Sequence, residues 1–72
     1  MQTERYKGFD LWGHAIEQQR DSSEKACYGA SGTVTRAGKL AAASDMLDVV
    51  ETDEAAQQLG LEWARAWVDS HG

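Results

Sequence analysis

The sequence predicts an α+β fold, a three-stranded antiparallel sheet with one C-terminal helix packed on one face. Apolar and polar residues alternate between residues 27 and 36, and polar or Gly-containing segments separate the extended stretches. After Thr52, apolar residues recur every three or four positions, which is the period of an amphipathic helix. We expect a single domain over residues 1–72, because a chain of 72 residues is too short to bury two independent cores.

The first strand is expected over residues 6–19 and is apolar on both of its sides. By position parity, Phe9 and Leu11 share one side, whereas Trp12 and Ile16 share the other. The first five residues are expected to fray. A polar loop over residues 21–25 then leads into the second strand.

The second strand is expected over residues 26–36, with a polar outer face. A tight turn at Gly38 leads into a third strand over residues 39–51. Its Ala-rich part, residues 40–48, is compatible with a helical turn or a strand, and we prefer an irregular strand that resumes at Leu47.

The helix is expected over residues 53–69. Thr52 is a suitable N-cap, and Asp53 and Glu54 place negative charge at the positive end of the helix dipole. Gly60 interrupts the helix and predicts a close approach to the sheet. The predicted buried stripe comprises Ala56, Leu59, Trp63 and Trp67.

The composition predicts a folded chain with a thin core. Leu, Ile, Val and Phe number only eleven, but three Trp and two Tyr add bulk. Cys27 is the only cysteine, so no intrachain disulfide can form, and with His14 and His71 it is too few for a tetrahedral Cys/His zinc site. We therefore expect no metal and no cofactor.

The charge balance bears on partners and location. Seven basic and twelve acidic residues give a net charge of −5, and the basic residues are scattered. We therefore expect neither nucleic acid nor a membrane as the partner. Residues 1–8 are polar and charged, unlike a secretory signal, so we expect a cytoplasmic protein.

One trio of residues has the types that a hydrolase needs. Asp10 and His14 share a strand side by parity, and Ser31 or Thr33 is expected opposite them. Such a trio on an open sheet face has no cleft to exclude water and no evident oxyanion hole. We therefore expect no catalytic residues and no enzyme activity.

Trp12 and Ile16 leave two interpretations open. If Phe9 and Leu11 meet the helix, these two large apolar residues face away from it, which is typical of an interface. Alternatively, a bulge near Gly13 changes the register and returns Trp12 to the core. The candidate interface residues on the open face are Trp12, His14, Ile16, Ser31 and Thr33.

We therefore expect a non-enzymatic protein-interaction domain that self-associates as a homodimer, through the open sheet face or an edge strand, or binds another protein. The alternative is a nucleic-acid-binding module, by loose analogy with double-stranded-RNA-binding domains. Those domains carry basic residues at the start of the last helix, where this chain has Asp53 and Glu54.

Three short motifs resemble those of a group of small bacterial proteins of unknown function. They are Tyr6-Lys7-Gly8-Phe9, Thr52-Asp53-Glu54-Ala55 at the helix start, and Ala64-Arg65-Ala66-Trp67-Val68-Asp69 at the helix end. The resemblance implies a β-β-β-α fold and supplies no activity or catalytic residue. The Ala run at 41–43 departs from it, because a bulkier third strand is expected there.

Overall fold

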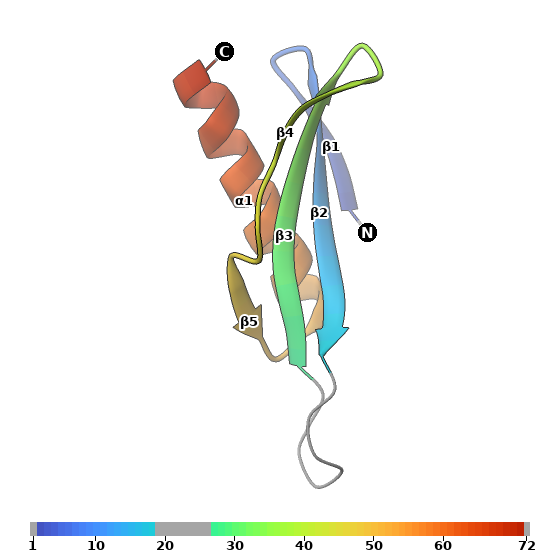
Figure 1. The fold of residues 1–72 in the computed structure, drawn as a ribbon, viewed down its shortest axis with the longest axis vertical. Helices are drawn as coiled ribbons and strands as arrows, with labels where there is room; N and C mark the ends of the chain where they lie inside the picture. The colour runs from blue at the N-terminus through green and yellow to red at the C-terminus, as the bar shows by residue number, and fades with distance from the viewer. Residues whose placement is uncertain (1, 19–26, 72) are drawn as a thin grey trace, which may run out of the picture.

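The computed structural model describes residues 2–18 and 27–71, which form an antiparallel sheet with one helix lying across one face (Figure 1). The strands pair in the order β1-β2-β3-β4, and β5 pairs with the other end of β3, along the same edge on which β4 pairs. The α+β class and the C-terminal helix are as predicted, but the sheet has five strands where three were predicted. The elements are β1 (Gln2–Tyr6), β2 (Phe9–Gln18), β3 (Cys27–Arg36), β4 (Lys39–Ala43), β5 (Asp48–Val50) and α1 (Asp53–His71).

The single first strand predicted over residues 6–19 is wrong, because a hairpin lies within its start. Lys7 and Gly8 have φ angles of 51° and 84°, and this left-handed pair makes a two-residue turn between β1 and β2. The expected frayed segment is therefore strand β1. Polar residues occupy most of β1, so the hydrophobic pattern gave no sign of it.

The predicted third strand over residues 39–51 is divided into β4 and β5. The turn at Gly38 is confirmed, with Ala37 and Gly38 at φ angles of 52° and 78°. The ladder is then broken at Ser44, whose hydroxyl accepts a hydrogen bond from the Gly32 backbone N–H at 2.7 Å. Pairing resumes after the Leu47 N–H donates to the Ala30 carbonyl at 2.7 Å. Residues 44–47 thus follow β3 without forming a regular strand.

The helix begins at the predicted residue and ends two residues later than predicted. Thr52 caps it as expected, its hydroxyl accepting a hydrogen bond from the Ala55 N–H at 3.1 Å. The buried face differs from the predicted stripe, because Leu59, Trp63 and Trp67 are only partly buried. The helix residues that are buried are Ala56, Gln57, Gly60, Leu61, Ala64 and Val68.

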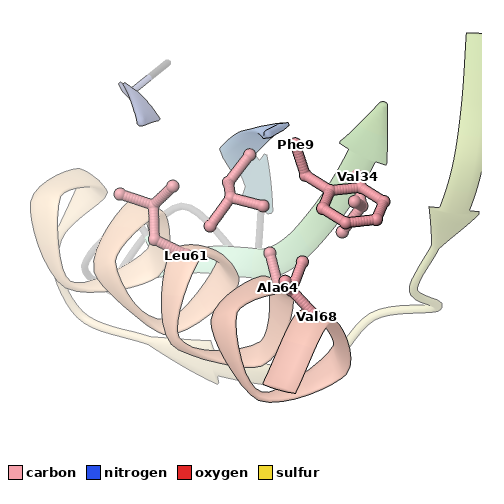
Figure 2. Packing of buried hydrophobic residues seen from close by; sticks show 6 residues of the cluster. Phe9, Val34, Leu61, Ala64 and Val68 are labelled. Carbon is pink, nitrogen blue, oxygen red and sulfur yellow. The ribbon is translucent and has the colours of Figure 1, made fainter. Parts of the chain in front are cut away.

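A close approach of helix and sheet explains this shift. A Cβ placed on Gly60 would clash with the Ser31 carbonyl and lie 3.1 Å from the Gly13 Cα. The predicted role of Gly60 is therefore confirmed, and a Trp side chain has no room at the centre of this contact. The core continues from this contact along the helix, with Phe9, Val34, Leu61, Ala64 and Val68 converging between the layers (Figure 2).

Alternate residues of β1 fasten this strand to the helix through polar contacts. The Gln58 side-chain amide donates to the Gln2 side-chain oxygen at 2.7 Å. Farther along, Arg65 donates from Nε and Nη2 to the two carboxylate oxygens of Glu4, at 2.8 and 3.3 Å. The hydrogen bond to Glu4 raises the pKa of Arg65.

The hairpin turn is held against the end of the helix by Asp69. The Tyr6 hydroxyl and the Lys7 ammonium both donate to Asp69 Oδ1, at 2.8 and 2.9 Å. These hydrogen bonds, the one from Lys7 first, lower the pKa of Asp69, and they raise the pKa values of Tyr6 and Lys7. The β1–β2 turn and the helix C-terminus therefore lie at the same end of the molecule.

Candidate functional site: the open face of the sheet

The face of the sheet opposite α1 carries the side chains predicted for an interface. On β2, Leu11 is fully buried beneath the helix, so its neighbours Asp10 and Trp12 point to the other face. The pairing of β2 with β1 and β3 continues through Gly13 without a register shift. The alternative of a bulge at Gly13 is therefore wrong, and Trp12 lies on the open face, where it is partly buried.

Two hydrogen bonds tie β2 to β3 at the centre of this face. The Trp12 indole Nε1 donates to the Thr35 hydroxyl at 3.1 Å, and His14 Nε2 shares a hydrogen bond of 3.0 Å with the Thr33 hydroxyl. The direct cross-strand partners of Trp12 and His14 are Thr33 and Ser31, so each side chain reaches two residues farther along β3. The indole and the imidazole therefore both lean toward the Arg36 end of β3.

The Asp10, His14 and Ser31 trio does not form a catalytic relay in this structure. Asp10 and His14 lie four residues apart on one strand, which separates their backbones by about 13 Å. Ser31 is opposite His14, but the hydrogen bond of the imidazole Nε2 is shared with the Thr33 hydroxyl. The orientation of a base by an acid, which the relay requires, is therefore missing.

An apolar patch occupies the face near the start of α1. Ile16, Gly29 and Val49 lie side by side on β2, β3 and β5. Above Gly29, the methyl Cε of Met46 lies only 2.7 Å from the place that a Cβ would take. Ile16 and Met46 are each 50% exposed and Val49 is 38% exposed, and we call these three residues the apolar patch.

The sequence predicted only Ile16 of this patch. Met46 belongs to residues 40–48, whose path the residue pattern left open. Val49 follows this segment, so the face on which it lies could not be inferred either. A signal was present in Gly29, because a residue without a side chain in the interior of a strand often marks the close approach of another group.

The opposite end of the same face has a shallow depression and an exposed leucine. The depression, of about 370 Å³, lies beside Trp12 and is lined by Thr3, Glu4, Arg5, Asp10 and Trp12. Two strands away, Leu40 pairs with Thr35 and is 68% exposed.

The two ends of the molecule carry different charges. The end at β5 and the start of α1, called here the acidic end, has six carboxylates and no Lys or Arg among residues 2–18 and 27–71: Glu17, Asp45, Asp48, Glu51, Asp53 and Glu54. The end with the two hairpin turns, called here the basic end, has the cations Arg5, Lys7, Arg36 and Lys39, together with Asp10 and Asp69. Figure 1 shows both turns and the helix C-terminus at this basic end.

The other polar groups of residues 2–18 and 27–71 show no ligand site. No cluster of three His, Cys, Asp or Glu residues suited to a metal occurs within the described ranges. The Cys27 thiol contacts the Gln18 carbonyl at 3.9 Å. Gln57 is 7% exposed and its side-chain amide donates to Asp53, whereas its buried Oε1 has no partner among the described atoms. In the part of the chain that is described, no helix has the length and apolar character needed to cross a membrane.

Comparison of the chain with protein-family models, with curated proteins and with solved structures found no match in any of the three.

Proposed function

We propose that this chain is a non-enzymatic protein-interaction domain that self-associates through the open face of its sheet. The observation that carries the proposal is the apolar patch of Ile16, Met46 and Val49. A chain with so few large aliphatic residues leaves two of them, together with Met46, on the face that the helix does not cover. Contiguous exposed apolar surface of this kind is typical of interaction sites.

A second copy of the chain suits this face because the face is self-complementary. It has an apolar patch toward the acidic end and the exposed Leu40 toward the basic end. The sheet is four strands wide, since β4 and β5 share one edge of β3, and its longest strands have ten residues, which gives a face of about 600 Å². Two such faces would bury about 1,200 Å², the lower limit for a specific interface, so we expect a weak dimer.

The edge strand β1 is the other surface that could pair with a second copy. β1 is five residues long and carries Glu4 and Arg5. Short, charged edge strands are a common way in which proteins prevent edge-to-edge pairing. We therefore favour the open face over the edge.

The alternative of nucleic-acid binding stays a prediction with less support. In double-stranded-RNA-binding domains the start of the last helix contacts phosphate, and here Asp53 and Glu54 stand in its first turn. Four further carboxylates surround them at the acidic end, which would repel phosphate.

The proposal includes a cytoplasmic location. The resemblance of the three short motifs to small bacterial proteins of unknown function adds no activity to it.

The proposal is tested by sedimentation equilibrium of the full chain between about 1 and 500 μM, a range that brackets a weak dimer. We expect a reversible monomer–dimer equilibrium. Ile16→Ser should weaken it at least tenfold, whereas Ala66→Ser, on an exposed part of α1, should leave it unchanged. A monomer over the whole range, or equal dimerisation of both variants, would overturn the proposal.

A further inference from the structure

We infer that the two copies pack with their ends exchanged, so that the apolar patch of each copy covers Leu40 and the depression beside Trp12 of the other. This inference rests on the proposed self-association and adds the orientation of the partner. It follows from the order in which residues are aligned across the sheet.

Cross-strand pairing arranges the open face in rows. One row contains Ile16, Gly29 and Val49, and the row six positions along β2 contains Asp10, Thr35 and Leu40. A two-fold axis that runs across the strands at Gly13 and Gly32 exchanges these rows between copies, because residue 13 is midway between residues 10 and 16. Val49 then lies over Leu40 of the second copy. Sheets packed face to face keep their strands within about 30° of each other, which this arrangement allows.

The same axis places Ile16 over Asp10 of the second copy, at the depression beside Trp12. This depression is the concave feature lined by Thr3, Arg5, Asp10 and Trp12, and Ile16 is a half-exposed side chain of suitable size to enter it. Near the axis, the Trp12 row faces the His14 row of the other copy. Ile16, Leu40 and Val49 therefore each obtain an apolar or concave partner.

Charge selects this orientation over the other possible one. Exchange of the ends places the acidic end of each copy over the basic end of the other. A two-fold axis parallel to the strands would instead place the two acidic ends together. Interfaces with like charges opposed are disfavoured, and those with opposite charges fix the register.

Cysteine cross-linking in a Cys27→Ser background tests the orientation. Leu40→Cys and Val49→Cys chains are prepared separately, mixed at a concentration where the chain is dimeric, and treated with a short bis-maleimide. We expect cross-linked pairs that contain one chain of each kind, and little linkage when either variant is treated alone. Sheets stacked face to face lie about 10 Å apart, which is beyond the reach of a disulfide but within that of a short bis-maleimide, so the reaction reports on close neighbours only.

The outcomes separate this inference from the proposed function. A chain that sediments as a monomer overturns the self-association itself. A dimer that links Val49→Cys to Val49→Cys, or that shows no linkage between the two variants, overturns the exchanged orientation and leaves the dimer intact.

Discussion

The Met46 thioether lies over the Gly29 backbone on the open face, with Cε 2.7 Å from the position of a Cβ on residue 29. A similar absence of a side chain at Gly60 has a different structural role, because the atoms facing it belong to the backbone of Ser31 and Gly13. One glycine supports a flexible side chain at the surface, and the other sets the distance between helix and sheet.

Substitution of these two glycines by Ala should therefore have unequal effects. Gly60→Ala forces the helix away from the sheet and should lower the free energy of unfolding by about 1–3 kcal/mol, although Ala favours helices. Gly29→Ala needs only a rotation of Met46 and should change stability by less than about 1 kcal/mol. Urea denaturation measures both values, and equal effects would show that the close contact at Gly60 does not limit packing.

Two residues of β2 separate stability from association. Leu11 is fully buried in the core, so Leu11→Ala should lower the free energy of unfolding by about 2–5 kcal/mol. Ile16 is half exposed, and Ile16→Ala should lower it by less than about 1 kcal/mol at concentrations where the chain is monomeric. If Ile16→Ala were as destabilising as Leu11→Ala under these conditions, Ile16 would belong to the core and not to an interface.

Asp69 should make the stability depend on acid pH. Hydrogen bonds from Lys7 and Tyr6 hold its pKa in the folded protein below the ordinary value of 3.8. A lowered pKa means that the carboxylate stabilises the fold above its unfolded-state pKa, and that this contribution is lost as the pH falls through the folded-state pKa. Asp69→Asn should therefore be less stable than the wild type at pH 6, and the difference should shrink toward pH 2.

Urea denaturation at several pH values measures this dependence. Glu62→Gln serves as the control, because Glu62 is exposed on the same helix and has no ion-pair partner at 4 Å or less among the described residues. A difference between wild type and Asp69→Asn that stays constant from pH 6 to pH 2 would contradict the assigned role of the carboxylate.

The Glu4–Arg65 pair should couple β1 to the helix only modestly. Both side chains are about one-third exposed, at 36% and 34%, so water screens their attraction. A double-mutant cycle with Glu4→Gln and Arg65→Gln should give a coupling energy of about 0.5–1 kcal/mol that decreases in salt. A coupling energy near zero would show that this ion pair does not help to hold β1 against the helix.

The predictable part of the fold is the part that hydrophobic periodicity and capping control. The helix start at Asp53, the turn at Gly38 and the two sides of β2 followed from residue pattern, because side-chain direction in a strand is fixed by parity. Strand β1 could not be predicted, since its attachment depends on contacts of Glu4 and Tyr6 with residues more than 60 positions away.

The candidate site was predictable to a similar extent. Parity placed Trp12, His14 and Ile16 on one face of the sheet. The register of β3 was needed to show that His14 shares its hydrogen bond with Thr33 and not with Ser31. Met46 and Val49 were missed because their position depends on Ser44, which interrupts the ladder and lets residues 44–47 leave regular pairing. Such an interruption has no periodic signal in the sequence.

The most direct measurement of the central claim is the solution mass of the unmodified chain by light scattering as its concentration is raised. We predict a mass that rises from 7.9 kDa toward twice that value at several hundred micromolar, and that stays at 7.9 kDa when Ile16, Met46 and Val49 are all replaced by Ser. A mass of 7.9 kDa for the unmodified chain at every concentration would contradict the claim that a second copy covers the open face.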